Sequence, residues 1–423
     1  MKFGVFYELQ LPRPWKEGAE HELFNNALDQ VVLADEIGID HAWAVEHHFL
    51  EEYSHCSAPE VFLAAAAART SRIRVGHGIR QVIANYNHPV RTAECIASLD
   101  LISNGRVDFG IGEGATRLEL HAFDIPAREK RAMSLEAAEQ IANMMVMTPY
   151  PGYEGKSFSL PARNVLPKPL QKPHPPMWIA CTNRDTIKLA AQNGLGALAF
   201  SFVDPEEAHK WSEIYYDIIK SEQCVPLGHA VNANIAIVSS FSMHRDRATA
   251  IRQGQEGFEF FGYALRRLVT EDTIPGYTTH FEEFLKTRGN RTEEMIAELN
   301  NQSEGMERSA GIGTPDDFRN HVNALENAGI DQVILLQQAG NNTHEQICSS
   351  LNLFAEEVLP EFKAKVEEKE AKKARELAPY IEAALERKDK MPTLSKDNVP
   401  LVKASVDMDT FNKRRYASRR KTD

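Results

Sequence analysis

The chain has 423 residues, of which 43% are hydrophobic and 26% charged, so it can bury a large core and is not a disordered protein. The formal net charge is −12, and residues 1–360 hold 31 Lys and Arg against 48 Asp and Glu. An acidic body of this kind disfavours binding to nucleic acid. No run reaches the roughly 18 to 20 apolar residues of a membrane span, and residues 1–7 read as a strand rather than a signal peptide, so we expect a cytoplasmic protein without a membrane partner.

Short apolar runs alternate with amphipathic helical patterns from the first residue onward. This alternation predicts a parallel sheet with crossover helices, and eight strands predict an α/β fold of the (β/α)8 TIM-barrel type, with insertions. The predicted strands cover residues 2–7, 40–46, 73–79, 106–111, 177–181, 195–201, 231–239 and 332–336. The predicted helices cover residues 23–37, 59–70, 90–102, 131–147, 184–193, 205–222, 245–257 and 315–328.

Three segments depart from this alternation. Residues 149–176 are dense in proline and glycine, which indicates an excursion in the form of a hairpin. Residues 262–313 are polar and too long for a simple connection, so we expect a lid insertion within a barrel that spans residues 1–360. Residues 361–423 form a charged extension, in which we predict a solvated helix at 363–387 and a disordered basic end.

The tetrapeptide Glu46-His47-His48-Phe49 lies at the end of the second predicted strand, where barrel enzymes place their chemistry. Successive side chains of a strand face opposite sides, so only one of His47 and His48 can enter a pocket. A chelating pair is therefore disfavoured, as is a metal-dependent hydrolase. The alternatives are an acid/base histidine and a histidine that satisfies backbone groups at the barrel rim.

Two further motifs have the composition of ligand sites. The run Phe109-Gly110-Ile111-Gly112-Glu113-Gly114 lets the backbone approach a ligand, but its spacing and its place on the fourth strand make it a weak dinucleotide fingerprint. Residues 182–186 open a helix with hydroxyl and amide side chains, which suits either a phosphate or ordinary N-capping. The five cysteines are far apart and form no Cys-x-x-Cys pair, so neither disulfides nor a zinc site is indicated.

Taken together and in order, these segments resemble the bacterial luciferase-like, flavin-dependent monooxygenase family from Met1 to about Pro360. The resemblance rests on an ordered set of short motifs, none of which is specific alone. They are the opening Met-Lys-Phe-Gly, Glu46-His47-His48-Phe49, His88-Pro89-Val90-Arg91, Gly105-Arg106 with Phe109-Gly110-Ile111, Ala190-Ala191-Gln192-x-Gly194, and Gly313-Thr314-Pro315.

The resemblance implies a barrel that binds reduced FMN at the carboxyl ends of its strands and lets it react with molecular oxygen. A flavin peroxide would then oxidise a small organic substrate such as an aldehyde, a ketone or an aromatic compound. It also implies that a separate flavin reductase supplies the reduced FMN, and that the chain forms a homodimer or a heterodimer with a related subunit.

The resemblance also assigns roles to residues. His47 matches the catalytic histidine, and Glu46 and His48 would support the pocket wall. Gly78 and Ile79 match a place where the family often holds a strained cis peptide against the flavin ring, and Gly112 stands where the luciferase subunit has a reactive cysteine. The residues that match the phosphate site are Arg131, Thr182, Asn183 and Thr186.

Glu113 departs from the family pattern, because the luciferase subunit has a phosphate-binding arginine at this position. We therefore expect Glu113 to be paired, with Arg117 as the candidate partner, and Arg184 to supply the missing positive charge to the phosphate. Candidates for the lining of the substrate pocket are Phe49, Tyr53, Arg80, Tyr86, Phe200 and Trp211.

Two alternative functions remain open from the sequence. One is an oxidoreductase that uses the deazaflavin coenzyme for hydride transfer in the same barrel. The other is a flavin-binding protein without catalysis.

Overall fold

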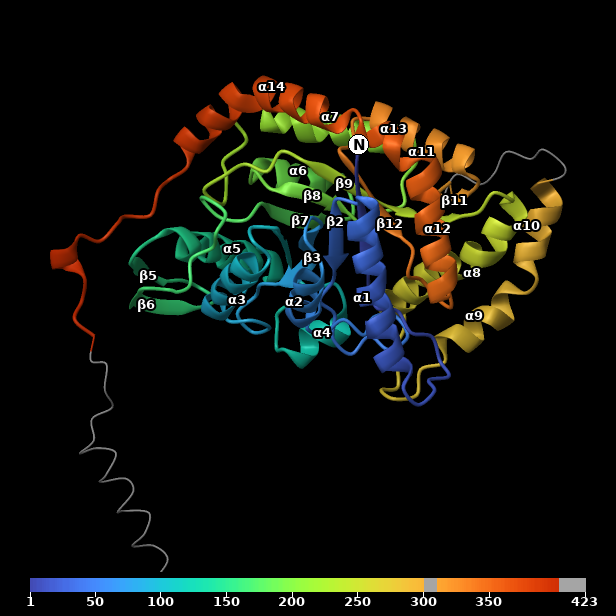
Figure 1. The fold of residues 1–423 in the computed structure, drawn as a ribbon. Coiled ribbons are helices and arrows are strands. Elements are labelled where there is room, and N and C mark those ends of the chain that lie inside the picture. The colour runs from blue at the N-terminus through green and yellow to red at the C-terminus, as the bar shows by residue number, and fades with distance from the viewer. Residues whose placement is uncertain (300–309, 403–423) are drawn as a thin grey trace, which may run out of the picture.

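The computed structural model describes residues 1–299 and 310–402. Eight parallel strands close into a barrel, in the spatial order β1-β12-β9-β8-β7-β4-β3-β2, with helices around it (Figure 1). The predicted (β/α)8 barrel is therefore confirmed. The barrel strands are β1 (Lys2–Tyr7), β2 (His41–Ala44), β3 (Arg74–Gln81), β4 (Val107–Gly112), β7 (Met177–Cys181), β8 (Gly196–Ala199), β9 (Ile235–Ser240) and β12 (Gln332–Leu336).

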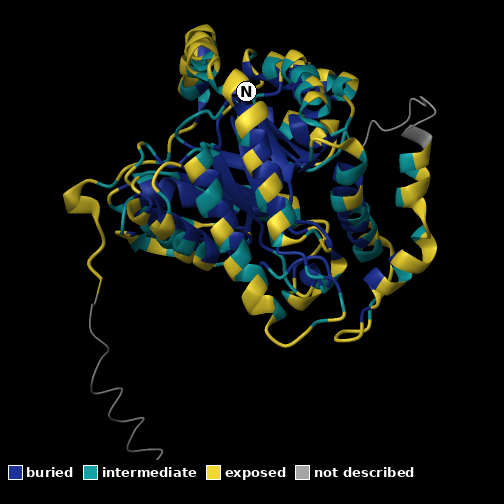
Figure 2. Cartoon of the chain, turned by 45° about the vertical axis from the view of Figure 1, so that its right-hand side comes forward, coloured by how far each residue is buried: buried dark blue, intermediate teal, exposed yellow. Residues whose placement is uncertain are grey.

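The helices present exposed stripes to solvent and cover the buried strands (Figure 2). Two of them, α4 and α12, were not predicted; α4 has only six residues, too few to show a helical period. The helices of the barrel are α1 (Ala19–Ile37), α2 (Pro59–Arg69), α3 (Pro89–Ile102), α4 (Arg117–Ala122), α5 (Lys130–Val146), α6 (Arg184–Gln192), α7 (Pro205–Ile219), α8 (Arg247–Thr270), α11 (Pro315–Asn327) and α12 (His344–Glu357).

Two excursions leave the regular alternation. The predicted hairpin is present as the antiparallel pair β5 (Tyr150–Glu154) and β6 (Ser159–Arg163). The polar insertion contains α9 (His280–Arg288) and α10 (Arg291–Leu299), and it returns through β11 (Ile312–Gly313), which pairs with β10 (Ser242–Met243). Helix α8 continues for thirteen residues beyond its predicted end at Gly257. Gly257 does not end the helix. It is needed for close packing instead, since a Cβ there would lie 2.3 Å from the Ala339 carbonyl oxygen.

The insertion is tied to the loop that follows the Glu46-His47-His48-Phe49 segment. The buried carboxylate of Glu52 accepts hydrogen bonds from the backbone amides of His280 (2.9 Å) and Phe281 (3.1 Å) at the start of α9, whose own N-cap residue forms no side-chain cap. Glu51 accepts from the Gly276 amide at 2.5 Å. Carboxylates at a helix N-terminus are favoured by the free amides and the helix dipole, so these two residues fix the insertion to the carboxyl end of the barrel.

The C-terminal extension packs on the barrel instead of standing free in solvent. It consists of α13 (Leu359–Lys363), α14 (Val366–Arg387) and a short 3₁₀ turn (Lys396–Asn398), and α14 lies across α7 in Figure 1. Lys373 pairs with Asp331 at 2.7 Å, and the Lys388 ammonium donates to the Leu227 carbonyl oxygen at 2.7 Å. The prediction of a solvated helix is thus wrong for one face of α14, and the predicted disordered end falls largely outside the described residues.

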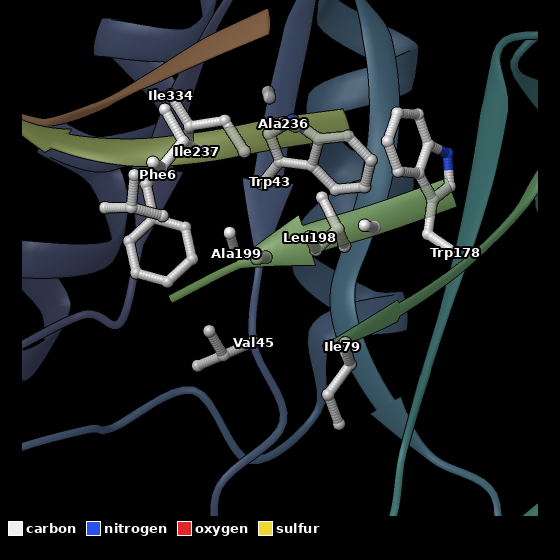
Figure 3. Close-up of a cluster of buried hydrophobic side chains, with 14 of the residues drawn as sticks. Phe6, Trp43, Val45, Ile79, Trp178, Leu198, Ala199, Ala236, Ile237 and Ile334 are labelled. Carbon is white, nitrogen blue, oxygen red and sulfur yellow. The ribbon is translucent and has the colours of Figure 1, made fainter. Parts of the chain in front are cut away.

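The centre of the barrel is filled by two tryptophans. Trp43 on β2 meets Trp178 on β7 edge to face, with ring centroids 5.4 Å apart (Figure 3). The backbone of β3 comes so close to this stack that a Cβ at Gly76 would lie 2.3 Å from Trp43 Cε3. Interiors are close-packed, so this contact leaves no room for a larger residue.

Gly76→Ala should therefore destabilise the protein by about 1–3 kcal/mol, because the new methyl group overpacks the tryptophan layer. The measurement is the midpoint of chemical denaturation. The matched control is Gly262→Ala in α8, where nothing lies within 4 Å of the added Cβ, so this variant should be equally stable or more stable. An unchanged midpoint for Gly76→Ala would show that the barrel core yields at this contact.

Candidate active site

A cavity of about 470 Å³ opens among the carboxyl ends of the barrel strands, within the size range of small-molecule sites. Loops after β1, β2, β4, β7 and β8 contribute to its wall, and two residues of α8, Phe261 and Leu265, cover it. Its wall combines apolar residues with polar and charged ones that come from separate segments of the chain. The apolar lining residues include Val45, Ile79, Ile179, Ala180, Leu189, Phe200, Phe202 and Val238.

His47 forms a polar part of the cavity wall. Trp43 points to the barrel axis, so the alternation of β2 carries Val45 and His47 to the same side, and both line the cavity. His47 Nδ1 lies 3.0 Å from Glu119 Oε1, and His47 Nε2 lies 3.8 Å from Glu8 Oε2. The imidazole is thus held between two carboxyl groups that come from α4 and from the end of β1.

These carboxyl groups control the charge of the imidazole. Burial alone would lower the pKa of His47, but the negative charge of Glu8, once this group has ionised, and that of Glu119 outweigh burial and hold this pKa well above the ordinary histidine value. Burial raises the pKa of Glu8 well above its ordinary range, against the opposing effect of His47. Burial alone would also raise the pKa of Glu119. The charge of His47 and the hydrogen bonds from Thr116 and the His48 amide outweigh burial, so this pKa is lowered. At neutral pH, Glu119 is therefore ionised and His47 is protonated.

The neighbours of His47 take different positions. Glu46 lines the cavity and accepts hydrogen bonds from the Gln81 amide (3.0 Å) and the Asn87 side chain (2.7 Å). His48 is not among the cavity-lining residues: its Nε2 lies 3.2 Å from Glu46 Oε1, and its ring packs against Tyr86 and Phe123. The side chain of His48 therefore supports Glu46, and its backbone amide supports Glu119.

Another part of the cavity wall carries positive charge from the start of α5. Arg131 and Lys130 both line the cavity, and both face Glu113: two Arg131 nitrogens lie 3.2 Å from its carboxylate oxygens, and Lys130 Nζ lies 3.5 Å away. The expected pairing of Glu113 is thus present, but its partners are Lys130 and Arg131 and not Arg117. Two cations thus face Glu113, and Asp185 is also close enough to raise the pKa of Arg131.

The start of α6 lines the same cavity, through Thr182, Asn183 and Thr186. Its free amides are already used: the Asn183 side chain accepts from the Asp185 and Thr186 amides, and Thr186 Oγ1 accepts from the Thr182 and Asn183 amides. A phosphate here would draw its charge compensation from α5 and would have to displace these capping bonds to reach the amides.

Arg184 is absent from the cavity lining, contrary to the expectation that it supplies charge to a phosphate. Its side chain is half exposed, and its guanidinium forms a two-pronged ion pair with Glu207 on α7. This partner holds Arg184 on the outer surface of α6.

Gly78 and Ile79 line the cavity, but the expected cis peptide is not present between them. In the part of the chain that the structure describes, every cis bond precedes a proline. The strand is instead interrupted by a shift in the register between β3 and β4, from His77 to Arg80, which turns Ile79 toward the cavity. Gly112 also lines the cavity, and its carbonyl oxygen accepts from Ser134 at 3.1 Å.

Sequence reasoning missed three residues of the site: Glu8, Glu119 and Lys130. Glu8 follows β1 in the way that Glu46 follows β2. In both cases a charged residue comes directly after an apolar strand, and this pattern could have indicated Glu8 as a site residue. Glu119 stands three residues after Thr116 in the spacing of a capping box, which explains its backbone role but not its reach to His47. Of the candidate lining residues, Tyr53 and Phe200 line the cavity, and Phe49, Arg80, Tyr86 and Trp211 do not.

Glu119→Gln should lower the pKa of His47 by about one pH unit or more, because the amide keeps the shape of the side chain and removes its charge. The measurement is an NMR titration of the imidazole nitrogens. Glu94→Gln, which removes a partly exposed carboxylate on α3 that pairs with Arg91, is the control and should leave the titration of His47 unchanged. An unaltered titration in Glu119→Gln would contradict the assignment of Glu119 as the dominant partner of Nδ1.

Among residues 1–299 and 310–402, no helix combines the length and the hydrophobicity needed to cross a membrane.

Comparison with known proteins identifies the family. The profile described as "Luciferase-like monooxygenase" matches residues 1–332. The oxygenase component of the flavin-dependent trigonelline monooxygenase of Acinetobacter baylyi is 24% identical over 88% of this chain and 98% of its own length.

Among solved structures, monooxygenase RslO1 from Streptomyces bottropensis shares 28% identity at a TM-score of 0.69, covering 86% of this chain and 100% of its own. The oxygenating constituent of 3,6-diketocamphane monooxygenase from Pseudomonas putida, solved with FMN, has the same fold at 19% identity and a TM-score of 0.64, covering 85% and 98%. The profile covers well over half of the chain, and the chain therefore belongs to the luciferase-like monooxygenase family.

Proposed function

We propose that this protein is a cytoplasmic, FMN-dependent monooxygenase that takes reduced FMN from a separate reductase and oxidises a small organic substrate with molecular oxygen. The observation that carries the proposal is the cavity at the carboxyl end of the barrel. Its wall includes the cationic side chains of Lys130 and Arg131, the charged imidazole of His47 and a set of apolar residues. A flavin mononucleotide presents groups that suit each of these: an anionic phosphate, a polar ring edge and a flat apolar ring face.

The residues present fit such a cofactor. Lys130 and Arg131 would hold the phosphate, with the start of α6 beside them. Ile79, Ile179 and Ala180 offer an apolar wall for a flat ring. The side-chain oxygen of Gln81 is buried, has no partner and belongs to a residue that lines the cavity, so it is available to a ring N–H. When bound, reduced flavin supplies two electrons to oxygen, of which one atom enters the substrate and the other leaves as water.

The chain's own residues would handle protons and exclude water. His47 stays protonated at neutral pH, so it can donate from Nε2 to an oxygen atom in the cavity and take the proton back afterwards. Phe261 and Leu265 of α8 close the cavity from above, and the anchors at Glu51 and Glu52 hold the insertion in place. We infer that this insertion acts as the lid of the 1–360 barrel unit, and that the 361–423 extension stabilises that unit without chemistry of its own.

The need for a partner reductase is part of the proposal. The Acinetobacter relative bears the name of an oxygenase component, which supports a two-component arrangement. The family resemblance supports a dimer. A deazaflavin coenzyme in the same cavity is the second candidate, and a non-catalytic flavin-binding protein is the third; the test below separates them.

His47→Ala should slow substrate oxidation by at least about 100-fold, because a positioned acid/base group contributes roughly 10²- to 10⁴-fold. The protein is mixed anaerobically with reduced FMN and then with oxygen and a panel of aldehydes, ketones and phenols. Product, oxygen uptake and hydrogen peroxide are measured. In the variant we expect oxygen to be diverted from product to peroxide.

His209→Ala, a change at an exposed histidine of α7, is the control and should behave as wild type. Substrate oxidation at the wild-type rate in His47→Ala would remove His47 from the mechanism. Turnover without oxygen and with the deazaflavin coenzyme would select the second candidate. Tight retention of oxidised FMN without any substrate-dependent oxygen uptake would select the third.

A further inference from the structure

The carboxyl group of Glu8 lies in the wall of the cavity, beside Nε2 of His47. Glu8 follows β1, is only 2% exposed and is placed by the same alternation that turns Gly4 and Phe6 to the barrel axis. Its Oε1 accepts a hydrogen bond from the Tyr53 hydroxyl at 3.0 Å. Its Oε2 is buried and has no partner, which is uncommon for a polar atom in a protein interior.

The charges around Glu8 determine its protonation state. His47, Glu119 and Tyr53 are the titratable groups that face it. One imidazolium stands between two carboxyl groups, so it can neutralise only one of them. Glu119 is the better placed, because it contacts Nδ1 at 3.0 Å and also receives bonds from the His48 amide (3.1 Å) and Thr116 Oγ1 (2.8 Å). A second buried carboxylate would remain uncompensated, so Glu8 is the group that keeps its proton.

The proton of Glu8 belongs on Oε2. Oε1 already accepts from Tyr53, which leaves Oε2 as the oxygen with a hydrogen to donate. His47 Nε2 lies 3.8 Å away and also carries a hydrogen, since Nδ1 faces Glu119. Two donors are therefore adjacent in the cavity wall, and an oxygen atom between them could accept from both.

We propose that Glu8 is a further catalytic residue: its neutral carboxyl, together with the imidazolium of His47, binds the carbonyl oxygen of the substrate. The inference rests on the proposed function and narrows its substrate class to aldehydes and ketones. Two fixed donors stabilise the negative charge that grows on a carbonyl oxygen when its carbon is attacked.

The reaction balances with the reactants already named. A ketone, molecular oxygen and reduced FMN give an ester, water and oxidised FMN. The O–O bond breaks, one oxygen atom enters the bond between the carbonyl carbon and its neighbour, and the other leaves as water with the two hydrogens of the reduced flavin. The flavin supplies the two electrons, and the hydrogens of Glu8 and His47 are returned at the end of the cycle.

Infrared spectroscopy tests the protonation of Glu8 without turnover. At about pH 6 exposed carboxyl groups are ionised, so a remaining protonated-carboxyl band comes from a buried acid. We expect this band in the wild-type protein, its loss in Glu8→Gln, and its persistence in Glu154→Gln, a change at an exposed residue of the hairpin. A wild-type spectrum identical to that of Glu8→Gln would show that Glu8 is ionised and would overturn the proposal.

The donor role is tested with cyclohexanone labelled with ¹³C at its carbonyl, added to the protein with oxidised FMN. Hydrogen bonds to the oxygen should shift the carbonyl stretch of the bound ketone to lower wavenumber in wild type. The shift should be smaller in Glu8→Leu, which lacks a donor, and retained in part in Glu8→Gln, which has an amide donor. Methylenecyclohexane, which has the same shape without the oxygen, should not displace cyclohexanone.

Equal carbonyl frequencies in wild type and Glu8→Leu, or no bound ketone, would overturn the assignment. Circular dichroism establishes that each variant is folded, and if Glu8→Leu does not fold, the comparison of wild type with Glu8→Gln decides. Failure of the proposed function would look different. The carboxyl band of Glu8 and the shifted carbonyl stretch would both be present, but the protein would consume no oxygen with reduced FMN.

Discussion

The site depends on one buried positive charge, the imidazolium of His47, and on the two carboxyl groups that face its two nitrogens. Three separate elements must meet for this contact: the end of β1 supplies Glu8, the end of β2 supplies His47, and the short helix α4 supplies Glu119. β1 and β2 are neighbours in the barrel, with Phe6 opposite Trp43, so the residues that follow them emerge side by side. The barrel closure thus fixes the geometry of the proton-carrying group.

The rest of the cavity is arranged around that charge. The cations at the start of α5, the start of α6 and a set of apolar residues line the same cavity as His47. Glu51 and Glu52 follow His47 closely in the chain and hold the insertion through the start of α9. The loop that follows the histidine is therefore also the anchor of the insertion.

Much of the fold could be predicted from sequence, because the alternation of short apolar runs with amphipathic helices indicates a parallel barrel whichever apolar residues form each run. All eight barrel strands lie where a short apolar run was found, and strand alternation alone indicated that one histidine of the pair faces inward. What could not be predicted depends on contacts between distant segments. The contact of Glu119 with His47 joins positions 72 residues apart, and Arg184 is removed from the cavity by Glu207, a residue of the next helix. No local pattern encodes either pairing.

The central claim is that the cavity between His47 and α5 holds a flavin by its phosphate. The measurement that tests it most directly is the affinity of the wild-type protein and three variants for FMN and for riboflavin, which lacks the phosphate. Lys130→Met and Arg131→Met should each weaken FMN binding by about tenfold or more and leave riboflavin binding unchanged, as expected for the loss of a charged hydrogen bond, and Arg184→Met should alter neither. Equal affinity of the wild-type protein for FMN and riboflavin, or a loss of FMN binding in Arg184→Met alone, would contradict the account.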